Sequence, residues 1–231
     1  MKRLVTSDWQ LCDNPRDRYR TDFVVKTLPI LIQKYKPDQL LILGDLTEQK
    51  DNHPASLVNE VTDTLCSLAS SFEIEIIVLQ GNHDFLHNAH PFFAFLENWP
   101  RIHWIKQPEE FDNCLYLPHT RNYKEDWKNI GFTKQYDYIF AHNIFTGVNA
   151  ASGHALSGIP PTIFPKDALV ISGDVHEPQT VADGRIIYVG SPCLTDFGDS
   201  YKPRVLLLDG LDVKSIKVKG VQKRLIQAYV E

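Results

Sequence analysis

The chain of 231 residues is 43% hydrophobic and 23% charged, with a formal net charge of −5, and this composition excludes an intrinsically disordered protein. No apolar run approaches the ~18 residues of a membrane span, and no apolar N-terminal segment predicts a signal peptide. The negative charge argues against a protein that grips long nucleic acids by charge alone. The four cysteines have no paired spacing, which indicates reduced thiols in a cytoplasmic protein. The length predicts a single domain over residues 1–231.

Short apolar strands alternate with amphipathic helices along the chain. Strands are expected at 4–7, 40–43, 75–79, 138–141, 169–172, 186–189 and 205–208. Helices are expected at 23–35 and 57–68, with a short aromatic helix at 91–96. The alternation predicts an α/β layered fold with a mixed sheet. The stretches 118–134 and 146–165 are expected to be long surface loops, which are more often functional than idle.

Five of the expected strands are followed at once by acidic, amide or imidazole side chains. In chain order these are Asp8 and Gln10, then Asp45, then Asn82, His83 and Asp84, then His142, and finally Asp174 and His176. In open α/β sheets, ligands bind at the carboxyl ends of the strands. The pattern therefore predicts one cluster of side chains at one edge of the fold.

The chemistry of this cluster suits divalent cations. Carboxylate, carboxamide and imidazole groups bind Mn²⁺, Fe²⁺, Zn²⁺ or Mg²⁺, and the lack of a nearby cysteine argues against a thiolate zinc site. Two metals about 3.5–4 Å apart need a shared carboxylate. Asp45 is the expected bridge, because the preceding Gly44 lets the chain turn sharply off a buried strand.

The remaining side chains divide between the two metals. Asp8 and His176 are predicted to hold one ion, and Asn82 and His142 the other. His83 lies next to a ligand and is itself free to donate a proton to a leaving oxygen. Each residue alone has an ordinary explanation as a turn residue or a hydrogen-bonded core histidine, but together they favour a metal centre.

The motifs Asp8-x-Gln10, Gly44-Asp45, Gly81-Asn82-His83-Asp84, His142 and Gly173-Asp174-x-His176 resemble the calcineurin-like metallophosphoesterase superfamily. The segments 173–179, 187–192 and 196–199 are further similar to the SbcD/Mre11 branch of DNA repair nucleases. The resemblance implies a four-layer sandwich of two mixed β-sheets flanked by helices, with a dimetal site at the rim where the strands end. It also implies two divalent ions, with Mn²⁺ favoured over Mg²⁺, Fe²⁺ or Zn²⁺.

The resemblance assigns roles to the individual residues. It implies that Gln10 joins Asp8, Asp45 and His176 at one metal, and that Asp174 joins Asp45, Asn82 and His142 at the other. It implies that His83 protonates the leaving group, and Asp84 is expected to orient it.

This chain departs from the superfamily pattern at three positions. The superfamily usually has histidine where Gln10 and Asp174 stand, and the nuclease branch often has histidine at Glu48. Asp174 can bind a cation through oxygen and would favour Mn²⁺ or Mg²⁺ over Zn²⁺. The branch histidine is associated with the phosphate of the bound strand, so Glu48 predicts different handling of DNA. The capping and ATPase-binding regions of the branch do not fit after Asp209, so an ATPase partner is not expected.

Further candidates for substrate contacts lie outside the motifs. Arg16, in a loop with Arg18 and Arg20, has the chemistry to clamp a phosphate, although a solvated charge run is the alternative. His119 is a candidate residue of the cleft. The nuclease branch tends to dimerise through helices near the first two motifs, so a homodimer through 57–68 stays open.

These observations favour a two-metal phosphoesterase that cleaves phosphodiester bonds, with DNA as the expected substrate. A short stand-alone form of this kind would suit a phage or an accessory repair gene. One alternative is a phosphatase or a cyclic-nucleotide or small-molecule phosphodiesterase, which the acidic balance favours. A second alternative is a binding module in which Gln10 and Asp174 mark a degenerate metal site.

Overall fold

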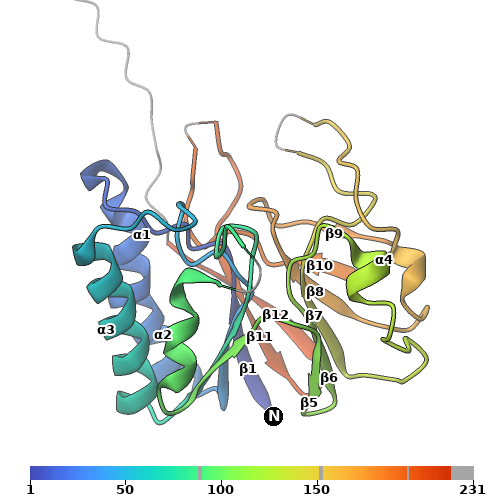
Figure 1. Cartoon of the computed structure of the whole chain (residues 1–231), viewed down its shortest axis with the longest axis horizontal. Coiled ribbons are helices and arrows are strands. Elements are labelled where there is room, and N and C mark those ends of the chain that lie inside the picture. The colour runs from blue at the N-terminus through green and yellow to red at the C-terminus, as the bar shows by residue number, and fades with distance from the viewer. Residues whose placement is uncertain (88–89, 151–152, 197, 220–231) are drawn as a thin grey trace, which may run out of the picture.

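Two six-stranded β-sheets form the centre of the computed structural model (Figure 1). The structure describes residues 1–87, 90–150, 153–196 and 198–219. Phe197, part of one predicted motif, lies outside the described residues. The two sheets are mixed and the larger helices flank one of them, so the expected α/β sandwich is confirmed.

The first sheet contains the strands that precede the first three motifs. Its order is β12-β11-β1-β2-β3-β4. The parallel strands are β1 (Lys2–Thr6), β2 (Gln39–Ile42), β3 (Glu75–Leu79) and β4 (Ile102–Ile105). β11 (Arg204–Asp209) runs antiparallel to β1, and β12 (Asp212–Lys217) pairs antiparallel with β11.

The second sheet contains the strands that precede the last two motifs. Its order is β5-β6-β7-β8-β10-β9. The parallel strands are β6 (Cys114–Leu117), β7 (Tyr138–His142), β8 (Val170–Gly173) and β10 (Ile186–Tyr188). The antiparallel edge strands are β5 (Glu109–Phe111) and β9 (Thr180–Val181).

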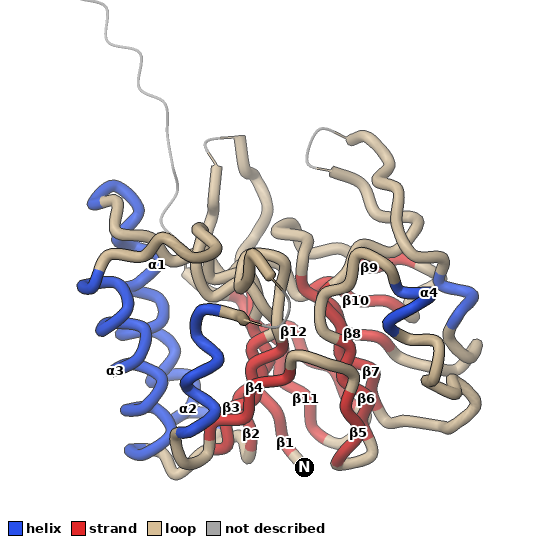
Figure 2. The backbone as a smooth tube through the Cα atoms, viewed as in Figure 1, coloured by secondary structure: helices blue, strands red, loops and turns tan. Residues whose placement is uncertain are grey.

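Helices cover the outer face of the first sheet (Figure 2). A continuous helical stretch contains α1 (Arg18–Asp22), a π-helical turn (Phe23–Thr27) and α2 (Leu28–Tyr35), and a short 3-10 turn (Pro15–Asp17) precedes it. α3 (Ala55–Ser71) packs beside it, and the expected aromatic helix is a 3-10 helix (Phe92–Asn98). The second sheet is covered by loops with α4 (Tyr123–Asp126) and a 3-10 turn (Pro161–Ile163).

Each central strand is apolar on both faces because it packs against a layer on either side. Leu40 and Ile42 of β2 face the helices, whereas Leu41 and the following Leu43 face the second sheet. The apolar side of α3 is buried in the first of these layers, through Leu57, Val61, Leu65 and Leu68. That face of 57–68 is therefore not free to meet a second copy of the chain. No helix of the described residues combines the length and hydropathy of a membrane span.

Candidate metal centre

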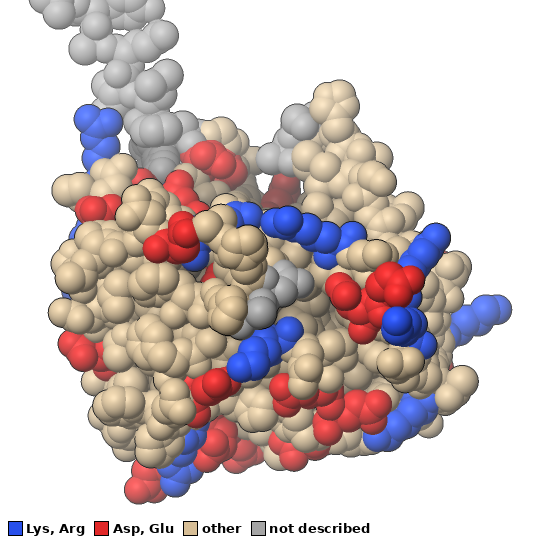
Figure 3. Space-filling view, in the orientation of Figure 1, with Lys and Arg blue, Asp and Glu red and all other residues tan. Residues whose placement is uncertain are grey.

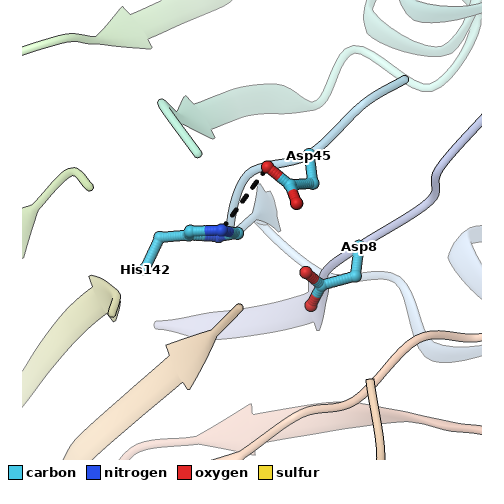
Figure 4. Close-up of side chains that lie close together, drawn as sticks. All are labelled: Asp8, Asp45 and His142. Carbon is cyan, nitrogen blue, oxygen red and sulfur yellow. Dashed lines mark ion pairs between the residues drawn. The ribbon is translucent and has the colours of Figure 1, made fainter. Parts of the chain in front are cut away.

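The ends of β1, β2 and β7 bring three polar side chains together at one edge of the fold. Asp8, Asp45 and His142 are at most 2% exposed. Each offers one potential ligand atom, and these atoms lie within 4.8 Å of one another. Figure 4 shows the three side chains pointing into a common space, with His142 Nε2 3.4 Å from Asp45 Oδ1. The sequence expectation that distant motifs meet at this rim agrees with this geometry.

The backbone around the cluster is held in an unusual conformation. Asp8, Gln10, Asp45 and Asp174 all have positive φ angles, of 51°, 48°, 58° and 77°. Non-glycine residues rarely adopt this region, and such strain concentrates at functional sites. Gly44, with φ 86°, also lets His142 approach, because a Cβ on it would lie 2.4 Å from His142 Nδ1. The chain thus turns sharply where each carboxylate enters the cluster.

The ring of His142 is oriented as a metal ligand needs, with Nε2 toward the cluster. Its Nδ1 lies 2.5 Å from the carbonyl of Leu43, so Nδ1 carries a proton and donates it there. The opposite nitrogen, Nε2, lies 3.0 Å from the Asn82 side-chain amide, which in its better-satisfied orientation also donates to Asp45, and 3.9 Å from Asp174 Oδ1. Nε2 therefore points into the group of polar side chains that the motifs bring together.

Asp45 is the central carboxylate of this group. Its Oδ1 accepts from the backbone N–H of His83 at 2.8 Å, and its Oδ2 accepts from Nε2 of Gln10 at 2.8 Å. Gln10 therefore touches the expected bridge through its amide N–H, in the position where the superfamily usually has a histidine. Asp174 approaches from the second sheet, and its backbone N–H donates to Asp8 Oδ1 at 3.2 Å.

The remaining oxygen of Asp8 tests whether the cluster fits a cation. Asp8 Oδ2 is buried and has no hydrogen-bond partner among the described residues. An unpaired buried carboxylate oxygen is costly, and here it belongs to the cluster that Asp8 forms with Asp45 and His142. Oxygen and imidazole donors in this arrangement fit a divalent cation of the Mn²⁺, Fe²⁺, Zn²⁺ or Mg²⁺ type.

A family model described as calcineurin-like phosphoesterase matches residues 1–208. The chain belongs to this family. It is accordingly a metal-dependent phosphoesterase of a family that uses a dimetal site, as the motifs predicted. In a search of curated proteins, no sequence matches the chain.

Solved structures share the phosphoesterase fold at low sequence identity. An archaeal phosphodiesterase has a TM-score of 0.50 and 15% identity, covering 94% of this chain and 100% of its own. A dimetal phosphatase from Danio rerio has a TM-score of 0.50 and 11% identity, covering 95% and 99%. The E. coli phosphoesterase Yfce has a TM-score of 0.47 and 16% identity, covering 95% and 100%. The first two likenesses bear out the fold.

The ionisable groups of the phosphoesterase cluster are strongly perturbed in the metal-free protein. Burial lowers the pKa of His142, but the carboxylates of Asp45, Asp174 and Asp8 outweigh it and raise this pKa to about 9. Burial raises the pKa of Asp8 to about 6, against the opposing effect of His142 and His176. His142 thus carries a second proton at neutral pH, on the nitrogen that a metal would contact.

We expect the stability of the metal-free protein to fall as pH rises. The raised pKa of His142 contributes stability that is present below its unfolded value of about 6.5 and is lost as pH approaches about 9. The raised pKa of Asp8 likewise makes stability fall as the pH rises from about 4 to about 6. Because a cation needs deprotonated ligands, Mn²⁺ should raise the Tm more at about pH 8.5 than at about pH 5.5. Thermal unfolding with EDTA or Mn²⁺ measures this, and a larger metal-induced shift at the lower pH would contradict it.

Asp84 holds the backbone of the site and does not orient His83, which corrects the sequence expectation. Its carboxylate is 1% exposed and accepts three backbone N–H bonds, from Gly81 at 2.7 Å, Asp45 at 2.9 Å and Leu46 at 3.0 Å. These bonds tie the loop after β3 to the loop after β2. Asp84 therefore holds the backbone of Asp45 in place.

His83 is held instead by the loop that contains Glu48. Its Nδ1 lies 2.6 Å from the backbone carbonyl of Glu48, so Nδ1 donates a proton to that oxygen. The half-buried ring thus keeps Nε2 available for another partner. The Glu48 carboxylate is half-exposed and accepts from Arg20 at 3.1 Å.

The other candidates for substrate contacts divide into one at the site and one away from it. His119 Nδ1 contacts the carbonyl of His142 at 3.2 Å, and burial lowers the pKa of this imidazole. Arg16 is exposed in the 3-10 turn before α1, and within the described residues no hydrogen bond or ion pair joins its guanidinium to the cluster. Arg20, one turn further along, is the buried arginine at the site.

Arg20 is a residue whose position sequence reasoning missed. Its guanidinium donates to the carbonyl of Gln10 at 2.7 Å and to the carbonyl of Thr195 at 3.1 Å, as well as to Glu48. It joins the loops that carry the first and second motifs to the loop between β10 and β11. Arg20 stands in a run of alternating charges, which is typical of a solvated surface. Only its position on the inward face of α1 distinguishes it from Arg16 and Arg18.

Proposed function

We propose that this phosphoesterase hydrolyses phosphodiester bonds in nucleic acid, as a small Mn²⁺-dependent nuclease similar to the SbcD/Mre11 branch. The observation that carries the hydrolytic part is the cluster of Asp8, Asp45 and His142, with His83 hydrogen-bonded to Asp45 through its backbone. It combines oxygen and nitrogen ligands with a positioned proton donor, the two elements that phosphoester hydrolysis requires.

The proposed ligand set is the one that the sequence motifs predict. Asp45 would be shared, Asp8 and His176 would hold one metal, and Asn82, His142 and Asp174 would hold the second. Gln10 is the weakest proposed ligand of the first metal, since its amide N–H is already directed at Asp45. Two bound cations supply an activated water and neutralise charge on the phosphoryl oxygens.

His83 is proposed to protonate the departing oxygen. Its Nδ1 is committed to the Glu48 carbonyl, and an imidazolium anchored in this way keeps an N–H on Nε2 for the leaving group. The backbone of the same residue donates to Asp45. The proposed acid and the shared ligand are therefore tied to each other by a hydrogen bond.

A cavity next to the centre supports binding of a nucleic-acid strand. It has a volume of about 240 Å³ and is lined by His119, Lys106, Gln107 and Trp127 among others. His119 lines this cavity and also bonds to the carbonyl of His142. Lys106 lines it together with Asp126 and pairs with Glu97 at 3.3 Å, so Lys106 would exchange this exposed partner for a phosphate next to the one that is cleaved.

A second cavity supports the alternative of a small substrate. It has a volume of about 210 Å³ and is lined by the acidic residues Asp174, Glu177, Asp196 and Asp199. The cavity lies between the loop that contains Asn149 and the loop that contains Asp196. In Figure 3, red acidic atoms are visible in a notch at the top of the molecule. Such a surface repels a second phosphate, so it favours a phosphatase or a small-molecule phosphodiesterase. The third reading, a degenerate binding module, has less support because the ligand atoms converge.

A substrate panel with Mn²⁺ tests the proposal. Single-stranded DNA, double-stranded DNA, cyclic nucleotides, bis-p-nitrophenyl phosphate and p-nitrophenyl phosphate are compared at equal protein concentration, with EDTA as the control. We expect cleavage of DNA and of the diesters, abolished by EDTA. Cleavage confined to the small substrates would contradict the nuclease proposal and support the alternative.

A further inference from the structure

The hydroxyl of Thr195 lies between His176 and Asp199, behind the metal centre. His176 Nδ1 is 3.0 Å from Thr195 Oγ1, and Thr195 Oγ1 is 3.1 Å from Asp199 Oδ2. Thr195 is 7% exposed, in the loop between β10 and β11. Thr195 and Asp199 are not among the metal ligands proposed above, but Thr195 contacts one of those ligands, His176.

The direction of the protons follows from the acceptors. Asp199 Oδ2 accepts from the backbone N–H groups of Thr195 and Asp196, at 2.7 Å each. A carboxylate only accepts, so the Thr195 hydroxyl donates its proton to Asp199 and turns a lone pair toward His176. His176 Nδ1 must then carry the proton, which leaves Nε2 as the nitrogen with a free lone pair.

The loop that carries Thr195 is tied down on its other side. Arg20 donates to the carbonyl of Thr195 at 3.1 Å, and Tyr19 donates to the carbonyl of Leu194 at 2.5 Å. Both donors come from α1, which packs on the first sheet. The backbone N–H of Ser191 donates to the carbonyl of His176 at 2.8 Å. The loop that carries the hydroxyl is thus bonded both to α1 and to the segment that carries the imidazole.

We propose that Thr195 is a positioning residue that fixes the tautomer and orientation of His176 for metal binding. The inference rests on the proposed ligand role of His176. Asp199 sets the direction of the hydroxyl, and Arg20 holds the main chain that carries it. Partners of this kind behind a metal-bound histidine typically contribute 10–100-fold to metal affinity.

The test compares Thr195→Val with Thr195→Ser. Valine keeps the shape but removes the hydroxyl, whereas serine keeps the hydroxyl. We expect Thr195→Val to weaken Mn²⁺ at one of two sites by about 10–100-fold in calorimetric titrations of metal-free protein, and Thr195→Ser to retain the wild-type affinity. Thr146→Val is the matched control, because the Thr146 hydroxyl also donates to a loop carbonyl, that of Gly158.

Nitrogen chemical shifts of the histidines give a second readout that needs no variant. In the metal-free wild type we expect His176 in the Nδ1–H tautomer, and in Thr195→Val a mixture of tautomers. An Nε2–H tautomer in the wild type, or unchanged affinity at both sites in Thr195→Val, would overturn the inference. Neither result depends on substrate, so a protein that binds metal normally but leaves DNA intact contradicts only the proposed nuclease. Unchanged metal binding in His176→Ala would instead remove His176 from the proposed ligand set.

Discussion

Asp45→Asn is expected to lower kcat/KM for phosphodiester hydrolysis by about 10³-fold or more, since removing even one electrostatic contact to the reacting group costs about 10²–10³-fold. Asparagine keeps the size of the side chain and one oxygen, but it removes the negative charge proposed to be shared by two cations. Mn²⁺ affinity should fall at both sites, because the shared ligand contributes to each.

The metal-free Tm distinguishes this result from a loss of folding. Asp45 raises the pKa values of both Asp8 and Asp84, so its charge repels these two buried carboxylates in the metal-free protein. Removing the charge relieves this repulsion but also removes the buried ion pair with His142 Nε2 at 3.4 Å. Kinetics, metal titration and thermal unfolding are measured together. Asp209→Asn is the matched control, because exposed Asp209 pairs with Lys2 at the opposite end of the first sheet. Near-normal turnover by Asp45→Asn would contradict the shared-ligand role.

His83→Ala is expected to slow substrates with alkoxide leaving groups by about 10²–10⁴-fold, the usual contribution of a general acid. Bis-p-nitrophenyl phosphate should be slowed far less, because nitrophenolate departs without needing a proton. Metal content should be unchanged, since the His83 ring is assigned no metal contact. The two leaving groups are compared within one variant, so errors in the concentration of active enzyme cancel.

The control for His83→Ala is His87→Ala, which removes an exposed histidine from the same loop after β3. That variant should cleave both classes of substrate at the wild-type rate. Equal slowing of both leaving groups by His83→Ala would assign His83 a role in positioning Asp45, through its backbone contact, and would refute its role as the acid.

The fold and the cluster were predictable because the same strands carry both. Runs such as 40–43 and 76–79 are apolar without interruption, as is typical of strands buried on both faces. Parallel strands then deliver whatever follows them to one edge. The convergence of Asp8 and Asp45 follows from this geometry within the first sheet, whereas His142 ends β7 of the second sheet and joins them because the two sheets pack together.

Five strands of the described residues were not predicted from the sequence. One of them, β6, is buried along its whole length, whereas the other four have weaker local signals. β4 carries exposed His103 between apolar residues, and β12 is mostly exposed. Neither therefore has the uninterrupted apolar pattern of a buried strand. β5 and β9 are edge strands of three and two residues. Such strands are defined by their pairing with neighbours, which the local sequence does not encode.

The roles of Asp84, Arg16 and Arg20 depended on side-chain direction. Adjacency in the motif suggested that Asp84 would orient His83, but the turn after β3 directs its carboxylate to backbone N–H groups. Three arginines share one short segment, and only the helical phase of α1 turns Arg20 inward. The contact of Arg20 with the carbonyl of Thr195 crosses most of the chain, so no local pattern announces it.

The most direct test of the shared-carboxylate centre is a crystal structure of the protein grown with Mn²⁺, with the ions located by anomalous scattering. Two peaks about 3.5–4 Å apart are expected, with Asp45 in contact with both, and with Asp8 and His142 on opposite ions. A structure without ions at this rim, or with a single ion that Asp45 does not touch, would contradict this expectation.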